Sequence, residues 1–293
     1  MYKRQIKGID FYNYAKEIIA QCDHIDFKLG DVGVVRDQEQ DVSVQIDSEK
    51  YTANYVFDSI VRKFPEEDKF FVWQHFLGWE IEVSSGDFDP DIATFMDFRI
   101  EQKGEVRFVY VLPWTKNRAL VEATLFSKNI CESDVYEEIL MDYMSSYLPH
   151  MQYKVLEKEI GAIPMTTMPF SKGSKRVIPI GTNNGTVKPS SGYAFVRIQE
   201  ECDELIRRID KGVYKRVKRS RKFKAYDRTL LNVILTDKVS GQSAFGEMFR
   251  NNDPTKILKF LNEKTSLIEE AGFFKTLPIW PFTRAFVQEL GSF

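Results

Sequence analysis

Residues that build metal centres are scarce in this sequence. Of its 293 residues, only 3 are Cys and 3 are His. Cys22, Cys131 and Cys202 lie far apart and form no Cys-x-x-Cys pair, a usage that suits a reducing compartment and gives no zinc site. The histidines are equally scattered along the chain. We therefore expect no metal site.

A surplus of positive charge and a long hydrophobic run are also missing. The formal net charge of -2 disfavours nucleic acid as a partner, because phosphate binding needs positive surface. With 43 % hydrophobic and 14 % aromatic residues, the chain can bury a sizeable core but is too polar to span a membrane. No basic start followed by an apolar core and a cleavage site opens the sequence, so we expect a cytoplasmic location.

Aromatic-rich β segments fill the middle of the chain. The pattern predicts four strands, at 70–80, 94–100, 106–112 and 118–126. We expect them to form one mostly antiparallel sheet inserted into an α/β frame. The many Phe, Tyr and Trp side chains of this sheet suit an ordinary core, and they equally suit a long hydrocarbon ligand.

Other signals predict helices and short strands around this sheet. Asp10 suits the N-cap of an amphipathic helix that runs to Ala20, and Asp253 before Pro254 predicts a helix start in a helical C-terminal part. Two prolines in 161–169 predict a shaped loop there. Further helices are expected at 133–147 and 194–209, and further strands at 32–35, 42–46, 51–57 and 153–160.

The strand 118–126 contains one carboxylate among apolar residues. Strand alternation places Glu122 on the same face as Leu120, Thr124 and Phe126. If that face lines an apolar pocket, burial raises the pKa of the carboxyl, and a protonated acid persists near neutral pH. If the face meets solvent, Glu122 is an ordinary surface residue. The strand alone leaves both interpretations open.

A glycine-rich loop follows the short apolar strand 176–180 and precedes the helix 194–209. Glycines let a backbone approach a ligand closely, and a helix start offers free N-H groups to oxygen atoms. A phosphate or flavin site and a plain strand-turn-helix connection both fit this pattern. Further on, 207–224 holds ten Lys or Arg residues and one acid, which indicates either a solvated face or attraction to an anionic membrane surface.

Several stretches together resemble one family, the flavin-dependent lycopene cyclases of carotenoid biosynthesis. The likeness extends over nearly the whole chain, in matching order and spacing. It rests on 74–78, 96–99, 108–113, 120–124, 163–165, 181–193, 252–254, 277–278 and 281–282.

The resemblance implies a Rossmann-like FAD-dependent α/β fold of the glutathione-reductase or hydroxylase type. It divides the chain into the remainder of an FAD-binding domain (1–69), an antiparallel substrate-binding sheet (70–165), an FAD-binding glycine loop and helix (166–210) and a helical C-terminal region (211–293). Family members begin with a strand, a Gly-x-Gly-x-x-Gly turn and a helix. No such turn precedes Glu122, so we expect this chain to lack its N-terminal nucleotide-binding unit.

The resemblance further implies the acid-catalysed, non-redox cyclisation of lycopene end groups to β-ionone rings, with reduced FAD beside the carbocation and NAD(P)H as reductant. It makes Glu122 the proton donor, and Asp97 is a second candidate acid or base. The implied substrate contacts are Phe108, Tyr110, Pro164 and Met165. The implied cofactor contacts are Gly181, Thr182, Asn183, Asn184, Gly185, Pro189, Ser190 and Gly192.

Peripheral contact with a membrane fits the apolar polyene substrate, while the oligomeric state stays open. Two other functions remain as alternatives. One is an FAD- and NAD(P)H-dependent oxidoreductase or hydroxylase that acts on an apolar substrate. The other is a protein without catalysis that binds an apolar ligand or a membrane.

Overall fold

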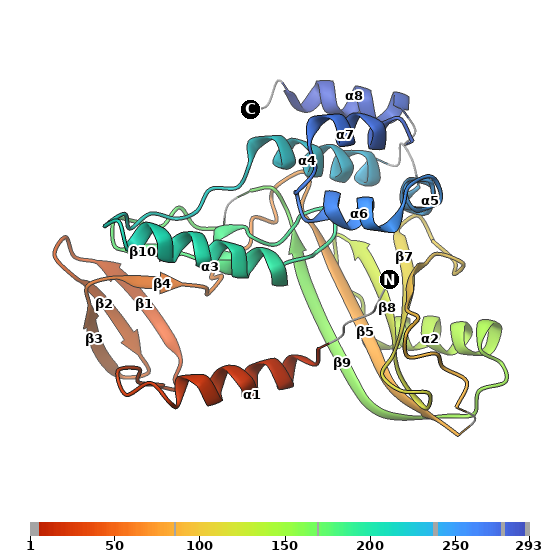
Figure 1. Cartoon of the computed structure of the whole chain (residues 1–293), viewed down its shortest axis with the longest axis horizontal. Coiled ribbons are helices and arrows are strands. Elements are labelled where there is room, and N and C mark those ends of the chain that lie inside the picture. The colour runs from red at the N-terminus through yellow and green to blue at the C-terminus, as the bar shows by residue number, and fades with distance from the viewer. Residues whose placement is uncertain (1–5, 85, 169, 237–239, 277–278, 291–293) are drawn as a thin grey trace.

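An antiparallel five-stranded sheet forms the body of the protein. The computed structural model describes residues 6–84, 86–168, 170–236, 240–276 and 279–290 (Figure 1). The sheet has the order β6-β7-β8-β5-β9, and all its pairs are antiparallel, as predicted. Its strands are β5 (Val72–Val83), β6 (Thr94–Asp97), β7 (Val106–Pro113), β8 (Arg118–Ser127) and β9 (Tyr153–Met165).

Strand β9 is longer than the sequence predicts. The expected loop around Pro164 is wrong at its start, because β9 continues to Met165 and places Pro164 opposite Trp73. Strand β9 is the last strand in the sheet order. A proline is tolerated on such an edge strand, because its missing N-H can face away from the ladder.

One face of the sheet is covered by α2 (Ser133–Tyr147), whose bounds match the predicted helix. Alternate residues of β5 and β8, including Trp79 and Val121, pack against Tyr136 and Leu140 of this helix. All four of these side chains are buried. This face is therefore an ordinary apolar core.

The opposite face carries Glu122, and we call it the acid face. Because side chains alternate along a strand and directly paired residues share a face, its members follow from the register. They include Gln74, Phe76, Gly78 and Glu80 of β5, Phe108 and Tyr110 of β7, Leu120, Glu122, Thr124 and Phe126 of β8, and Glu157, Glu159, Gly161 and Met165 of β9.

Helices of the C-terminal part cover one end of the acid face (Figure 1). Phe108, Phe126 and Met165 form one buried cluster with residues of these helices, among them Phe245. The predicted cap is confirmed, because the Asp253 side chain accepts a hydrogen bond from the N-H of Thr255 at the start of α6. The helices are α4 (Arg221–Leu235), α5 (Gly241–Asn251), α6 (Pro254–Leu261), α7 (Leu267–Phe274) and α8 (Ile279–Leu290).

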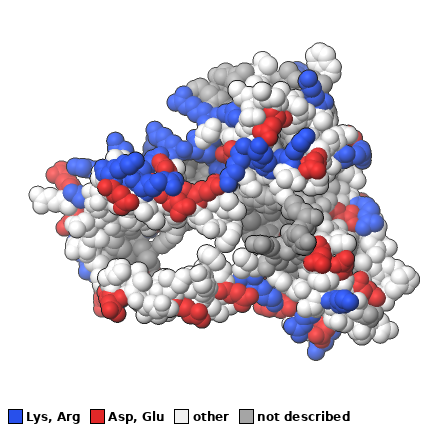
Figure 2. Space-filling model, in the orientation of Figure 1, with Lys and Arg blue, Asp and Glu red and all other residues white. Residues whose placement is uncertain are grey.

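The N-terminal part extends away from the body as an arm. It contains α1 (Gly8–Ile19), β1 (Val32–Asp37), β2 (Val42–Ile46), β3 (Glu49–Ala53) and β4 (Val56–Asp58). The predicted strand 51–57 is wrong, because β3 and β4 are separate strands in different sheets. Asp10 is not the N-cap of α1; Lys7 holds that position, and no α1 residue is buried. Figure 2 shows an opening between α1 and α3 (Phe195–Ile209).

The predicted strand-loop-helix at the glycine loop is present. Strand β10 (Val177–Pro179) pairs with β4 in parallel. The short 3-10 helix η1 (Gly181–Asn184) follows β10, and the chain then reaches α3. Because β4 and β10 run in the same direction, Asp58 and the glycine loop meet at their carboxyl ends, where open α/β sheets hold their ligands.

Candidate active site

On the acid face, Glu122 is flanked by one directly paired residue from each neighbouring strand. Tyr110 of β7 is directly opposite on one side, and Gly78 of β5 is directly opposite on the other. The Thr124 hydroxyl donates a hydrogen bond of 2.7 Å to the Glu122 carboxyl. Glu122 is half-buried, so it is not the fully solvated surface residue of the second interpretation.

Burial raises the pKa of the Glu122 carboxyl from its ordinary value of 4.5 to about 8. The hydrogen bond from Thr124 opposes this rise, while the nearby Glu159 carboxyl adds to it through charge repulsion and a hydrogen bond. With this pKa the carboxyl keeps its proton at neutral pH. Glu122 can therefore act as a general acid.

Aromatic side chains adjoin the acid. The Phe108 ring centroid lies 5.1 Å from that of Tyr110 and 5.5 Å from that of Phe126. Burial raises the pKa of Tyr110 well above its usual range, and the neighbouring Tyr193 and Glu122 raise it further. Tyr110 is therefore neutral, and the face around Glu122 presents uncharged π surfaces.

The second half of the glycine loop packs onto the acid face. Gly192 has φ +71°, and a Cβ placed there would come within 2.2 Å of Gln74 Oε1. Only glycine permits this approach. Ser190, Tyr193 and Tyr110 line one small cavity of about 10 Å³. The fold thus brings two predicted sites, the Glu122 strand and the glycine loop, to the same place.

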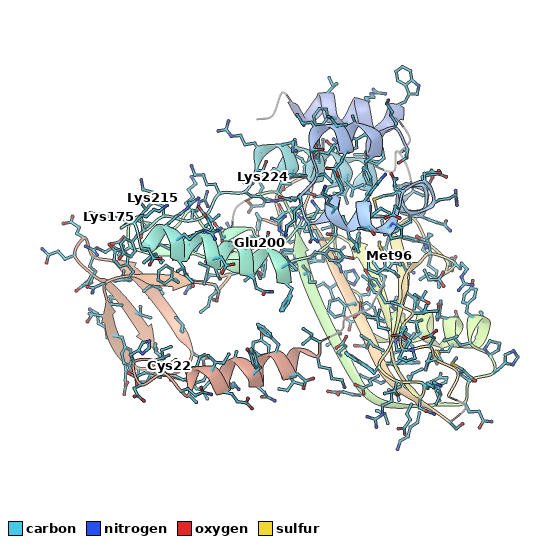
Figure 3. The ribbon with its side chains drawn as sticks, viewed as in Figure 1. Cys22, Met96, Lys175, Glu200, Lys215 and Lys224 are labelled. Carbon is cyan, nitrogen blue, oxygen red and sulfur yellow. The ribbon has the colours of Figure 1, made fainter. Side chains whose placement is uncertain are left out.

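The first half of the loop is held by hydrogen bonds within the protein. The N-H of Gly181 donates to Glu201 Oε2 over 3.0 Å, and the Thr186 hydroxyl donates to the same oxygen over 2.6 Å. The Asn183 side-chain amide donates to the Asp58 carbonyl over 3.1 Å. These bonds fix the loop to α3 and to the end of β4. Figure 3 shows Glu200, the neighbour of Glu201, on α3 above the opening.

Two buried polar atoms lack a partner where the loop meets the sheet. Among the residues that the structure describes, Gln74 Oε1 and Ser191 Oγ are buried without a hydrogen bond. Gln74 lies on the acid face, and Ser191 borders the same small cavity as Tyr110. An unsatisfied buried polar group costs about 1–3 kcal/mol. A polar ligand that supplies one donor and one acceptor would satisfy both atoms.

Asp97 and Pro164 do not lie with Glu122. Asp97 pairs with Val109 on the α2 side of the sheet. Its carboxylate binds the Arg99 guanidinium over 2.5 Å and accepts a 2.8 Å hydrogen bond from the Tyr143 hydroxyl. Burial raises the pKa of Asp97, but these hydrogen bonds outweigh that effect and hold it below its usual value. Asp97 is therefore ionised and oriented toward α2, which does not fit an acid beside Glu122.

Pro164 lies opposite Trp73, on the α2 side, whereas Met165 lies on the acid face in the same cluster as Phe108. These two neighbouring residues, both predicted to contact the substrate, thus point to different sides of the sheet. Sequence reasoning missed Gly78, Gln74 and Glu159, which the register places on the acid face. A glycine inside the long apolar strand 70–80 is the one local signal that could have drawn attention to this position.

A comparison with known protein families decides the assignment of the chain. The family described as "Lycopene cyclase protein" matches residues 13–287. The chain belongs to the lycopene cyclase family. Because the match includes both the Glu122 strand and the glycine loop, the resemblance seen in the sequence is confirmed.

Individual relatives of the family match shorter stretches. A chloroplastic neoxanthin synthase of Solanum tuberosum is 31 % identical over 45 % of this chain, and a chloroplastic lycopene beta cyclase of Arabidopsis thaliana is 29 % identical over 56 %. The lycopene beta-cyclase of Pantoea ananas is 27 % identical over 45 %. These matches span 29 %, 36 % and 35 % of the three relatives, so the chain spans about a third of their length.

The fold of this cyclase-family chain also occurs in a solved structure. A geranylgeranyl bacteriochlorophyll reductase-like protein of Thermoplasma acidophilum superposes with a TM-score of 0.54 at 12 % identity. The superposition covers 97 % of this chain and 74 % of that one. At this identity the likeness establishes the fold alone.

Two further properties concern metals and membranes. Across the described ranges, His, Cys, Asp and Glu form no group of three that could hold a metal ion. Within the same ranges, no helix combines the length and the apolar character needed to cross a bilayer.

Proposed function

We propose that this chain carries the acid site of a lycopene cyclase, which closes the end groups of lycopene to β-ionone rings without net redox change. The observation that carries the proposal is a protonated Glu122 on an aromatic sheet face. A carboxyl whose pKa is raised to about 8 by burial keeps its proton at neutral pH and can deliver it to an unreactive double bond. Membership of the family supports the choice of a polyene as the substrate.

The reaction begins when the Glu122 O-H protonates a terminal double bond of the polyene. The next double bond attacks the resulting carbocation, which forms the ring, and loss of a ring proton restores a double bond. Tyr110 is paired with Glu122 and Phe108 with the neighbouring Thr124, and the π systems of both rings can stabilise the cation. Both side chains are uncharged and come from the strand next to the acid.

Membership of the family supports a flavin beside the glycine loop, although the cavity where the loop meets the acid face, about 10 Å³, is too small to hold a flavin ring in this structure. At this junction the two unsatisfied atoms offer an acceptor, Gln74 Oε1, and a donor, Ser191 Oγ, and Gly192 lets the loop backbone pack against Gln74. A reduced FAD supplies an electron-rich ring that stabilises a nearby cation, with NAD(P)H as the reductant. Along the loop we assign cofactor contacts to Gly181, Thr182, Asn183, Asn184, Gly185, Pro189, Ser190 and Gly192.

We also propose peripheral contact with a membrane, from which an apolar polyene would enter. Leu267 and Ile268 open α7 and are 68 % and 87 % exposed, and Trp280 at the start of α8 is 85 % exposed. Exposed apolar side chains of this kind anchor peripheral proteins at an interface. Lys215 adds positive charge near the outer end of α3 (Figure 3).

The proposal is tested by expressing the complete natural gene product in cells that accumulate lycopene. Formation of β-carotene supports it. The gene product is then purified and assayed with lycopene and NAD(P)H. Consumption of NAD(P)H in proportion to product contradicts a non-redox cyclisation and favours an oxidoreductase. Unchanged lycopene contradicts the proposal.

A further inference from the structure

A glycine separates two carboxylates on the acid face. Gly78 of β5 is directly paired with Glu122 of β8 on one side and with Glu159 of β9 on the other. The three residues therefore form one row across three strands, and their side-chain positions point to the same side of the sheet. Neighbouring strands lie about 4.8 Å apart, so the backbones of Glu122 and Glu159 are separated by roughly twice that distance.

The missing side chain at Gly78 lets the two carboxyls meet. A Cβ at this position would lie 2.9 Å from Leu120 Cδ1 and 3.0 Å from Glu159 Cγ. The Glu159 side chain thus occupies the space above Gly78, close enough for its carboxyl to raise the pKa of the Glu122 carboxyl. Any larger residue in the middle of the row would push Glu159 away.

Glu159 also faces solvent. It is exposed, unlike Glu122. It lines a cavity of about 380 Å³ between the acid face and residues 6–9, together with Glu80 and Glu157. Glu159 therefore connects water on one side with the half-buried acid on the other.

We propose that Glu159 is the residue that returns protons from solvent to Glu122. The proposal rests on the cyclisation proposed above. After Glu122 has given its proton to the polyene, Glu159 takes a proton from water and passes it to Glu122: an O-H bond breaks on Glu159 and one forms on Glu122. The ring proton lost from the product goes to solvent, so no proton is consumed overall.

Other charged groups around the row are few in the described residues. Tyr110 comes from β7, Glu80 from β5 and Glu157 from β9, while Lys7 before α1 pairs with Glu80 over 2.6 Å. Arg118 of β8 approaches Glu80 within 4.0 Å as well. Among these carboxylates, Glu159 is the one whose charge raises the pKa of Glu122.

The first test follows the titration of Glu122 in the purified 293-residue chain by isotope-edited infrared or NMR spectroscopy, and it needs no lycopene. Glu159→Gln removes the like charge and should lower the midpoint of Glu122 by about half a unit or more. Gly78→Ala should lower it too, because it moves Glu159 aside. Glu138→Gln, on the exposed side of α2, is the matched control and should leave it unchanged. An unchanged midpoint in Glu159→Gln overturns the proposal.

The second test measures turnover in the active gene product. Glu159→Gln should lower steady-state turnover at least about tenfold. A single turnover, started with Glu122 already protonated, should proceed at the rate of the unmodified protein. Glu159→Asp should restore part of the loss. Full steady-state turnover in Glu159→Gln overturns the relay. If the unmodified protein leaves lycopene unchanged although the titration shows the interaction, the cyclisation and the relay fail together, while the pairing of the two carboxyls stands.

Discussion

Replacing Glu122 by Gln should change how the stability of the fold depends on pH. The native carboxyl titrates at about 8 instead of 4.5, chiefly because burial disfavours its charge. Between these two pH values the native state holds a proton that the unfolded chain releases. The free energy of unfolding therefore falls as pH rises through this window, and the fall ends once Glu122 ionises in the native state.

The size of this effect follows from the pKa shift. One pKa unit corresponds to 1.36 kcal/mol, so a rise from 4.5 to about 8 sets an upper limit of about 5 kcal/mol. Interaction with Glu159 shares the proton between two groups, so we expect on the order of 3–4 kcal/mol for the complete titration. Glutamine has a similar shape and does not ionise, so the Glu122→Gln chain should lack this loss.

The assay is urea unfolding of the purified chain between pH 5 and pH 8, followed by Trp fluorescence and circular dichroism. The stability of Glu122→Gln relative to the unmodified chain should increase by about 2–3 kcal/mol over this range. Glu138→Gln serves as the control and should follow the unmodified chain. Parallel pH profiles for Glu122→Gln and the unmodified chain would refute the buried, protonated acid.

Three further outcomes are expected. Gly192→Ala should destabilise the fold by about 1–3 kcal/mol in thermal unfolding and weaken flavin binding, because its Cβ would collide with the sheet. Gly104 is the control: it also has a positive φ, but a Cβ there would meet no atom within 4 Å. Gly104→Ala should therefore destabilise the fold less and leave flavin binding unchanged. Lys188→Met should lower the free energy of unfolding in urea by about 3–5 kcal/mol, because Lys188 is fully buried 2.8 Å from the Asp227 carboxylate. A decrease below about 1 kcal/mol would argue against that buried pair. Trp280→Ala should reduce sedimentation with lipid vesicles while leaving the circular dichroism spectrum unchanged; equal sedimentation would contradict the membrane contact.

Features set by neighbouring residues could be predicted from the sequence. The strand β8 around Glu122, the helix α2 and the glycine loop before α3 follow from alternation, helical spacing and glycine chemistry within short windows. Their bounds differ little from the predicted ones. The raised pKa of Glu122 was one of two interpretations that its strand left open, and burial in the fold is its first cause.

Features set by pairing between distant strands could not be predicted. The row of Glu122, Gly78 and Glu159 depends on the register of β5 with both β8 and β9, and no local pattern encodes this register. The same reason explains Pro164, which is tolerated only because β9 is an edge strand. The place of Asp97 on the α2 side depends on the pairing of β6 with β7, and Tyr143 of α2 meets its carboxylate only in the fold.

The role of Glu122 is tested most directly by the pigments of lycopene-accumulating cells that express the complete gene product. The unmodified protein and Glu138→Gln should convert lycopene to β-carotene. Glu122→Gln should bind flavin to the same extent and leave lycopene unconverted, because its amide has no acidic proton to give. Undiminished β-carotene from Glu122→Gln would contradict Glu122 as the proton donor.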